Sequence, residues 1–436
     1  MPMHFRHFMT RRAGLLLAFL LLVGCASQIA PTGTTTSVPS TTPVAAAQPG
    51  VYGPAELRRA YHVDSLIQQG FTGKGQTIID LVCFGNPQVQ SDLDTYSQAY
   101  GLPHVTVQQV APLGPNPTPA NDADRQFQNR WAGETSLDVE LYHALAPDAA
   151  IAVVATNVCA PEGLVGMSQS RETLQYALDH HLGNIISVSG GTSEATLADP
   201  ASRAELKLWD PILQQSTMQG GVTYFVSSGD NGATDFQDRN ATQLATSPTT
   251  SFPTDSPWVT SVGGSTLQPT ATGFAEQAWN NSGGGFSAFY DEPAYQHALP
   301  AAAQTLLQGR RGVPDVAADA NPRTGVRVSI QGQWQSFGGT SISAPIWAGI
   351  MAVADQMAGK SLGFINPALY QIGLSSKAAT DFNDITQGNN TQLLGNTTVQ
   401  GYPAVAGWDP ITGFGTPNAA KLIPDLIALL AGKSLG

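Results

Sequence analysis

The feature that most restricts the fold of this 436-residue chain is a series of short apolar segments separated by helical patterns. Each apolar segment is rich in Ile and Val and ends in small or turn-forming residues; the five segments are 76–82, 150–155, 185–189, 222–227 and 258–262. The helical patterns between them lie at 90–100, 134–146 and 167–181. Strands that are apolar on both faces are typical of parallel sheets. The alternation therefore predicts a doubly wound α/β domain, with a mostly parallel sheet and helices on both of its faces.

Functional residues are expected just after these strands, because ligands of open α/β sheets bind at the carboxyl ends of the strands. Asp230 lies in such a position, since segment 222–227 runs into a turn of small residues at 228–232. An Asp-Asn-Gly sequence also favours an ordinary turn, in which the Asp side chain bonds to the neighbouring backbone. The pattern alone leaves both interpretations open.

A serine at the start of a helix is the second candidate. Residues 338–345 read Gly-Gly-Thr-Ser-Ile-Ser-Ala-Pro and lead into the apolar run 346–354, which predicts a buried helix. Two glycines allow a sharp turn, and Pro345 suits the first turn of a helix. Ser341 would then lie beside free backbone N–H groups and the positive end of the helix dipole, which suits a nucleophile that forms an oxyanion. The alternative is a capped core helix without chemistry.

A serine nucleophile needs a base, which is usually a histidine. The eight histidines lie in the N-terminal leader, at a helix end or in segments without a glycine-rich motif; they are His4, His7, His62, His104, His143, His180, His181 and His297. The His-Gly-Thr-His sequence of a subtilisin-type enzyme does not occur. The sequence therefore argues against a Ser-His-Asp triad.

Two acidic residues are better candidates for the base. Glu134 and Asp138 are four apart in a predicted helix and share one face, whereas Glu140 points to another. If that face meets a buried site, the pair holds one proton and one of its pKa values is raised. A solvated surface pair is the other interpretation of this spacing.

Taken together and in this order, the acid pair, the turn with Asp230 and the Gly-Thr-Ser341 motif resemble the sedolisins, or serine-carboxyl peptidases, and in particular their kumamolisin branch. The resemblance extends over about residues 51–430 and includes further matching stretches at 144–149, 187–191, 252–253, 262–264, 279–280, 282–285 and 313–316. It implies a subtilisin-like fold in which the histidine is replaced.

The resemblance also implies roles for individual residues. Ser341 would be the nucleophile, Glu134 the general base and later acid, and Asp138 the residue that orients Glu134. Asp230 would donate a hydrogen bond to the oxyanion. Asp80 aligns with a longer Glu that extends the hydrogen-bonded network in some relatives, so its part in the network is open.

The substrate-lining strand of the family corresponds to Ser189, Gly190 and Gly191. Only a protonated Asp230 can donate a hydrogen bond, and a Glu base works near its own pKa, so activity is expected at acidic pH. The predicted activity is cleavage of protein or peptide substrates by an endopeptidase. A tripeptidyl-peptidase and a catalytically silent binding protein on the same scaffold are the alternatives.

A metal site is implied near the C-terminus, in a loop over 384–415. Carboxylates of Asp384 and Asp409, with backbone carbonyls of Ile385, Val405 and Gly407, would form an oxygen cage for one Ca²⁺ ion. Val405 stands where the kumamolisin pattern has a glycine, so its backbone must suit a β-branched residue.

The N-terminal residues indicate export. Basic residues precede a 12-residue apolar run that ends in Leu-Val-Gly-Cys25, which resembles a bacterial lipobox. We expect a signal peptide at 1–24, a lipid on Cys25, a tether of Thr, Ser, Pro and Ala at 25–50 and a catalytic domain at 51–436, with no prodomain evident. The expected location is the bacterial cell envelope, at the outer membrane or the outer face of the cytoplasmic membrane, or secretion. The alternative is an ordinary signal peptide with a chance cysteine.

Composition restricts the partners. Charged residues make up only 12% of the chain, the net charge is −12, and there is no basic run, which excludes nucleic acid as a partner. The membrane would be contacted through the lipid on Cys25 only, and a monomer is expected. Cys83 and Cys159 each follow a predicted strand, so they form either a disulfide or two inert thiols.

Overall fold

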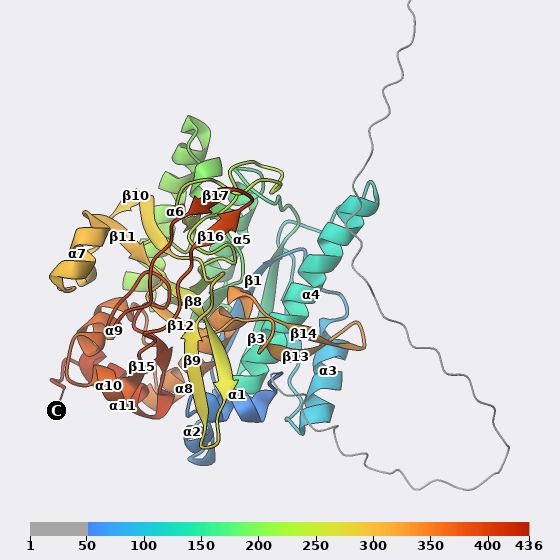
Figure 1. Ribbon diagram of the computed structural model, residues 1–436. Coiled ribbons are helices and arrows are strands. Elements are labelled where there is room, and N and C mark those ends of the chain that lie inside the picture. The colour runs from blue at the N-terminus through green and yellow to red at the C-terminus, as the bar shows by residue number, and fades with distance from the viewer. Residues whose placement is uncertain (1–50, 436) are drawn as a thin grey trace, which may run out of the picture. The chain divides into compact units, whose positions relative to one another are not determined.

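The computed structural model describes residues 51–435 (Figure 1). The predicted signal peptide, Cys25 and the tether lie outside the described residues. No helix within residues 51–435 is both long enough and apolar enough to cross a membrane.

The centre of the fold is an eight-stranded sheet whose main order is β12-β8-β6-β4-β1-β3-β2 (Figure 1). All neighbours in this order pair in parallel, and β9 joins β8 antiparallel. These strands are β1 Thr77–Cys83, β2 Val107–Val110, β3 Ala150–Thr156, β4 Ile185–Val188, β6 Thr223–Ser227, β8 Thr260–Pro269, β9 Phe274–Ala278 and β12 Val316–Asp319. The predicted mostly parallel sheet is confirmed, and each of the five predicted strands is present.

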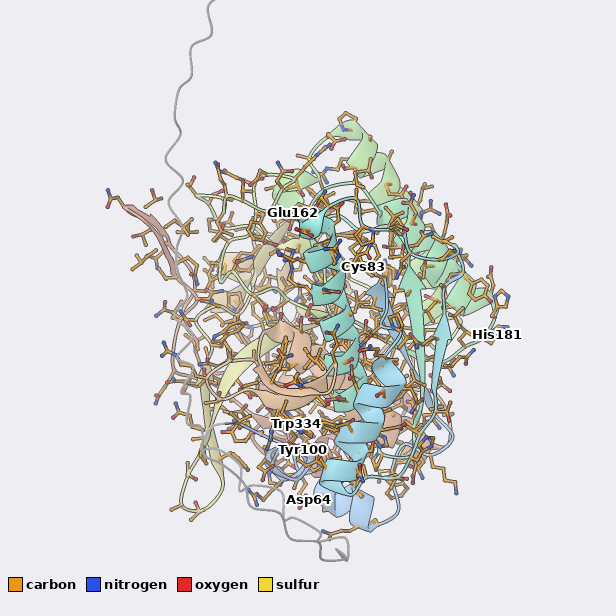
Figure 2. The ribbon with its side chains drawn as sticks, turned by 90° about the vertical axis from the view of Figure 1, so that its right-hand side faces the viewer. Asp64, Cys83, Tyr100, Glu162, His181 and Trp334 are labelled. Carbon is orange, nitrogen blue, oxygen red and sulfur yellow. A yellow bond between two sulfur atoms is a disulfide. The ribbon has the colours of Figure 1, made fainter. Side chains whose placement is uncertain are left out.

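Small two-stranded sheets lie around this core. They pair β5 Thr192–Ser193 with β7 Ser251–Phe252, β10 Gly285–Asp291 with β11 Arg310–Val313, β13 Val326–Ile330 with β14 Gln333–Phe337, β15 Phe382–Asn383 with β18 Thr416–Pro417, and β16 Gln392–Leu394 with β17 Thr397–Val399. The hairpin β13–β14 ends one residue before the glycine turn that precedes Ser341. Tyr100 and Trp334 meet edge to face with ring centres 5.8 Å apart, so this hairpin packs against α3 (Figure 2).

Helices cover both faces of the sheet, as predicted. The side chains of α4 and α8 pack in one apolar core, and those of α5 and α6 pack in a second one on the opposite face. The helices are α1 Pro54–Ala60, α2 Asp64–Gln68, α3 Val89–Tyr100, α4 Asp122–Leu145, α5 Met167–Asp179, α6 Pro200–Met218, α7 Ala301–Leu307, α8 Thr340–Ala358, α9 Asn366–Gly373, α10 Ala378–Asp381 and α11 Ala419–Leu430, with short 3₁₀ turns at Glu194–Thr196 and Ala294–Gln296.

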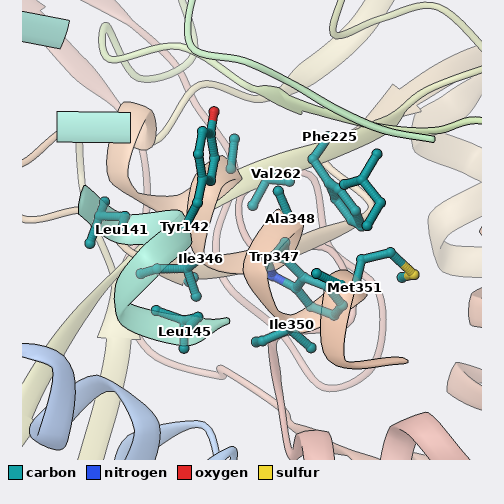
Figure 3. Packing of buried hydrophobic residues seen from close by; sticks show 14 of the residues in the cluster. Leu141, Tyr142, Leu145, Phe225, Val262, Ile346, Trp347, Ala348, Ile350 and Met351 are labelled. Atoms are coloured by element: carbon teal, nitrogen blue, oxygen red, sulfur yellow. The ribbon is translucent and has the colours of Figure 1, made fainter. Parts of the chain in front are cut away.

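Helix α8 is the buried helix expected from the apolar run (Figure 3). Almost every side chain from Ile342 to Asp355 is buried. The indole of Trp347 stacks on Phe225 of β6 with ring centres 6.0 Å apart, and its Nε1 donates a hydrogen bond of 2.8 Å to the carbonyl of Ala317. A Cβ atom on Gly349 would lie 2.6 Å from the Cβ of Leu145. The absence of a side chain at this point therefore lets α8 and α4 approach closely.

Helix α4 begins earlier than the sequence pattern predicts. It starts at Asp122 instead of 134, after Asn121, whose side chain accepts a hydrogen bond of 2.9 Å from the backbone N–H of Asp124. Residues 122–130 are exposed or half-buried, so they show no apolar periodicity to reveal the helix. The buried half of α4 is the part that the sequence pattern located.

Candidate active site

The turn before Ser341 has two requirements that only glycine meets. Gly339 has a φ of +101°, in the region that residues with a side chain rarely adopt. A Cβ atom at this position would also lie 2.5 Å from Oδ2 of Asp230. The chain thereby brings the first turn of α8, with the half-buried Ser341, against the carboxyl group that follows β6.

Asp230 is held by the residue next to Ser341. Its Oδ1 accepts a hydrogen bond of 2.7 Å from the backbone N–H of Thr340 and one of 3.0 Å from the Thr340 hydroxyl. Since Oδ1 has two donors, a proton on this carboxyl group belongs on Oδ2. Desolvation by the surrounding protein raises the pKa of Asp230, and the hydrogen bonds from Thr340 oppose the rise. The side chain of Asp230 is exposed to solvent in the cleft, so a substrate that covers it would add to the rise.

Glu134 lies beside both groups. Burial raises its pKa to about 7, and the negative charge of Asp230 adds to the rise. The nearby side chains of Ser341 and Ser189 oppose it, because a hydroxyl directed at a carboxylate stabilises the charged form. Oε1 of Glu134 is buried and has no hydrogen-bond partner among residues 51–435. The group is therefore poised to accept a proton.

Asp138 and Asp80 continue this row of carboxyl groups into the protein interior. Both are fully buried; burial raises the pKa of Asp80 to about 8 and that of Asp138 well above its usual range, and the charges of the neighbouring carboxyl groups add to both rises. Oδ2 of each has no hydrogen-bond partner among residues 51–435, and the two carboxyl groups are close enough for the charge of Asp80 to raise the pKa of Asp138. The Tyr142 hydroxyl donates to Asp80 at 3.4 Å. The aspartate at position 80 therefore reaches Asp138 despite its short side chain.

Ser189, which the resemblance assigned to substrate binding, also contacts the row of carboxyl groups. Its Oγ donates a hydrogen bond of 2.9 Å to Asp138 and lies 3.3 Å from the backbone carbonyl of Ser341, so it joins the acid helix to the nucleophile helix. Gly190 faces Trp131, whose Cη2 would lie 3.0 Å from an added Cβ. A Cβ on Gly191 would lie 2.9 Å from the carbonyl of Phe252. Substrate binding by these residues stays a prediction, and for Ser189 the structure adds a contact with the carboxyl row.

His143, the histidine on α4, contacts a loop and not the row of carboxyl groups. The Nε2 atom of the buried His143 lies 2.8 Å from the carbonyl of Pro103, and burial lowers its pKa to about 4. The sequence argument against a histidine base is consistent with this position.

An apolar cavity of about 260 Å³ opens on one side of Ser341, over the carboxyl ends of β1, β4 and β6. Its lining includes Ser189, Gly190, Gly191, Trp131, Trp209 and Phe252. Cys83 and Cys159, which form a disulfide with a Cα–Cα distance of 5.9 Å, are part of its wall. The disulfide is therefore the correct alternative for these two cysteines.

A polar cavity of about 640 Å³ lies on the other side, toward β8, β9 and the segment after β12. Its lining includes Trp279, Asn280, Asn281, Asn321, Arg323 and Asn389. A Cβ on Gly338 would lie 2.5 Å from Cα of Pro322, and the backbone N–H of Gly232 donates to the carbonyl of Asn281 at 2.8 Å. The polar cavity thus adjoins the turns of both Ser341 and Asp230.

The predicted metal loop brings two carboxylates to one short segment. Oδ2 of Asp384 accepts a hydrogen bond of 2.8 Å from the backbone N–H of Gly407, and Oδ2 of Asp409 accepts one of 3.1 Å from that of Val405. Burial raises the pKa of Asp409 to about 7 and also raises that of Asp384, as expected for carboxylates placed without a counter-ion. Gly407 has a φ of +80°, whereas Val405 is outside the positive-φ region, so a β-branched residue fits there. Within the described part of the chain no group of three or more His, Cys, Asp or Glu side chains gathers to form a metal site.

Comparisons with known proteins point to one family. The family model described as "Subtilase family" matches residues 131–402. Kumamolisin from Bacillus sp. (strain MN-32) is 33% identical over 390 residues, which is 87% of this chain and 64% of that protein. Tripeptidyl-peptidase sed4 from Aspergillus fumigatus is 30% identical over 377 residues, which is 76% of this chain and 59% of that protein. The chain thus spans less than two thirds of the length of these relatives.

A solved structure is similar over nearly its whole length. Pseudomonas sedolisin, described as a serine-carboxyl proteinase and complexed with pseudo-iodotyrostatin, superimposes with a TM-score of 0.72 at 28% identity, covering 87% of this chain and 98% of that one. The predicted subtilisin-like architecture is confirmed by this match.

Proposed function

This chain belongs to the subtilase family and, within it, to the kumamolisin-like sedolisins, and from that membership we propose that it is a serine-carboxyl endopeptidase that hydrolyses peptide bonds of proteins at acidic pH. The observation that carries the proposal is the convergence of Ser341, Glu134 and Asp230 in one cleft, backed by the buried carboxyl row through Asp138. Sedolisin-family relatives are serine-type peptidases, which supports the reaction class, and the residue roles are those that the resemblance implies.

In the first half of the reaction, Ser341 Oγ attacks the carbonyl carbon of the scissile bond while Glu134 accepts the hydroxyl proton. The negative charge that develops on the carbonyl oxygen is stabilised by a protonated Oδ2 of Asp230 and by the backbone N–H of Ser341. Glu134 then returns the proton to the leaving amine as the C–N bond breaks, which leaves an acyl group on Ser341. In the second half, water attacks the acyl group with Glu134 again as base, and Ser341 leaves with its proton restored.

The buried end of the carboxyl row keeps Glu134 in position. The pKa values of Asp138 and Asp80 are both raised, so both groups are protonated in acid and the row has no further negative charge that would repel the ionised Glu134. Ser189 fixes Asp138 with its hydrogen bond and touches the backbone of Ser341.

The working pH follows from the protonation of Glu134 and Asp230. The active form has one proton, on Asp230, and none on Glu134. Because the pair shares protons, its rate is highest between the two apparent pKa values, whichever group titrates first. The pKa of Glu134 is about 7 and that of Asp230 lies above its ordinary value near 3.8. We therefore expect a bell-shaped profile with an acidic maximum.

Cleavage within chains is favoured over tripeptide release by the two cavities on opposite sides of Ser341, because a substrate that fills both extends in both directions from the scissile bond. A tripeptidyl-peptidase is the second candidate, since one relative bears that name. The test is digestion of one long peptide at pH 3–6 by the purified chain and its Ser341→Ala variant. Internal products that disappear in the variant support the proposal. Successive N-terminal tripeptides support the second candidate. Equal turnover by both proteins would refute Ser341 as the nucleophile, and turnover by neither would favour a binding protein on the same scaffold.

We further propose that one Ca²⁺ ion binds the loop of Asp384 and Asp409. The buried carboxylate of Asp409, the exposed carboxylate of Asp384 and the carbonyl groups of the segment between 405 and 409 supply the hard oxygen ligands that Ca²⁺ prefers. A bound ion would hold this loop against the core and would take no part in the bond-breaking step.

We also propose that the chain is exported and anchored by a lipid on Cys25. The proposal rests on the lipobox-like sequence alone. Fractionation of cells that express the wild type or Cys25→Ser tests it: the wild type should sediment with membranes and the variant should not. Sedimentation of both would contradict the lipid anchor.

A further inference from the structure

The polar cavity beside Ser341 has an unusual charge for this chain. Acidic residues outnumber basic ones by 32 to 20, yet the lining contains one arginine and no carboxylate. The other polar members are amides and a hydroxyl, from Thr266, Gln277 and four asparagines. The lining therefore carries a positive charge on a chain whose net charge is −12.

Arg323 is the source of the positive charge. It is exposed, and it forms no ion pair with any residue in 51–435. Its backbone N–H donates a hydrogen bond of 3.0 Å to Oδ1 of Asn321, whose Nδ2 in turn donates to the hydroxyl of Thr266 at 2.9 Å. Asn321 therefore links the backbone of Arg323 to β8, and both polar atoms of its side chain are engaged in hydrogen bonds. The guanidinium group of Arg323 is left to interact with a ligand in the polar cavity.

The nearby carboxylates are turned away or already engaged. Glu276 alternates with Gln277 along β9 and accepts hydrogen bonds from Ser265 and Asn383 at 2.6 and 2.8 Å. Asp319 is fully buried and accepts from the backbone of Leu267. Asp230, at the end of the cavity next to Ser341, is protonated in the active form proposed above. No internal partner therefore competes for the guanidinium.

The sheet order fixes which part of a substrate meets this cavity. The enclosed apolar cavity lies over β1, β4 and β6, whereas the polar cavity lies beyond β8 and β9, and the turns of Asp230 and Ser341 separate the two. A peptide whose residue before the scissile bond enters the apolar cavity must pass the residues after that bond over the polar one. These residues belong to the leaving segment.

We propose that the polar cavity is a binding site for the leaving segment, and that Arg323 selects a carboxylate there, supplied by an acidic side chain among the first three residues after the scissile bond. Amide groups such as the exposed Asn280 and Gln277 are suited to hydrogen bonds with the peptide backbone. The inference rests on the proposed function, because it assumes that the chain cuts peptides at Ser341.

The test uses quenched fluorescent peptides that are identical up to the scissile bond and carry Glu, Gln or Lys at the first, second or third position after it. At pH 5 the wild type should cut the best Glu peptide about two- to fivefold faster than its Gln counterpart, as expected for one partly exposed ion pair. Lys should be the slowest. Arg323→Gln should remove the preference, so that the Glu and Gln peptides are cut at equal rates, and Arg323→Lys should retain part of it.

Arg310→Gln is the matched control, because Arg310 is exposed and lines neither cavity. It should keep the wild-type preference. The preference should also vanish at pH 3, where a Glu side chain is protonated, and weaken in 0.5 M salt. Equal rates for Glu and Gln peptides in the wild type, or a preference that survives in Arg323→Gln, would overturn the inference.

A binding measurement separates this inference from the proposed activity. In Ser341→Ala, fluorescence anisotropy should give tighter binding of the Glu peptide than of the Gln peptide by the same factor, and Arg323→Gln added to this background should equalise them. A preference in binding with no turnover by the wild type would refute the peptidase proposal alone. Turnover without a preference in binding would refute the role of Arg323 alone.

Discussion

Replacing Asp230 by asparagine tests the proposed source of the acidic working pH. The structure makes this a conservative change, because Oδ1 of Asp230 accepts hydrogen bonds of 2.7 and 3.0 Å from Thr340, and an amide oxygen accepts them equally well. The amide nitrogen then takes the place of Oδ2 and donates to the oxyanion at every pH. Asparagine should therefore retain the donor, whereas Asp230→Ala should lose about 10²–10³ in kcat.

Two changes in the pH profile are expected for Asp230→Asn. Above the upper apparent pKa, wild-type kcat/KM should fall tenfold per pH unit, and in the variant it should stay level, so the ratio of the two rises tenfold per unit. In the variant only Glu134 titrates, with a pKa below about 7 because the negative charge of Asp230 is gone, so this pKa alone should set the acidic limb and the limb should not lie below that of the wild type. The assay is kcat/KM for one neutral peptide from pH 2.5 to 9.

The wild type and Asp230→Ala are the controls for this series. A variant with the bell-shaped profile of the wild type would show that Asp230 does not set the alkaline limb. An Asn variant as inactive as the Ala variant at all pH values would show that a hydrogen-bond donor at this position does not account for the role of Asp230. Either result would refute the assignment of Asp230 to the oxyanion.

Three further outcomes are expected. Ser189→Ala should lower kcat about tenfold with little change in KM, since it removes the hydrogen bond to Asp138 worth about 1.5 kcal/mol; a rise in KM alone would favour a pure substrate-binding role. The inactive Ser341→Ala chain should lose thermal stability as pH rises from 4 to 8. The folded-state pKa of Asp80 (about 8) is above its unfolded value, so protonated Asp80 stabilises the fold in acid and this contribution is lost as Asp80 ionises. Scanning calorimetry should show a fall in melting temperature on the order of 5–10 °C, and a rising melting temperature would contradict the shift. Chelation should lower the melting temperature by a few degrees, as expected for about 3 kcal/mol of linked binding, and Asp384→Asn should abolish the response to the chelator; an unchanged wild type would argue against the calcium loop.

Sequence patterns located the parts of this fold whose chemistry repeats along the chain. Strands that are apolar on both faces and the buried helix α8 have periodic or continuous apolar residues, so their positions were predictable. The first three turns of α4 are exposed and polar, and they were missed because tertiary packing and the Asn121 cap, rather than an apolar stripe, define them.

Some residues of the site could be found from local sequence patterns, and others could not. Asp230 follows a strand and Glu134 shares a helix face with Asp138, so local spacing marked them as candidates, and the resemblance gave them roles. The contact between Asp80 and Asp138 depends on which strands flank β1 and on how α4 crosses the sheet, neither of which a single segment specifies. The hydrogen bond from Ser189 to Asp138 and the free guanidinium of Arg323 likewise arise from folding and have no signal in the local sequence.

The close approach of α4 and α8 depends on the absence of a Cβ atom at Gly349, and it affects the reaction at Ser341. Gly349 lies eight residues from Ser341, or roughly 12 Å along the helix axis. A Cβ there would press on Leu145, and the two helices could only separate or rotate. Ser341 travels with one helix and Glu134 with the other, so the gap across which a proton must move would widen with them. The reacting distance of this site is therefore set by backbone packing two turns away, and selection on the rate would act on a residue that touches neither substrate nor solvent.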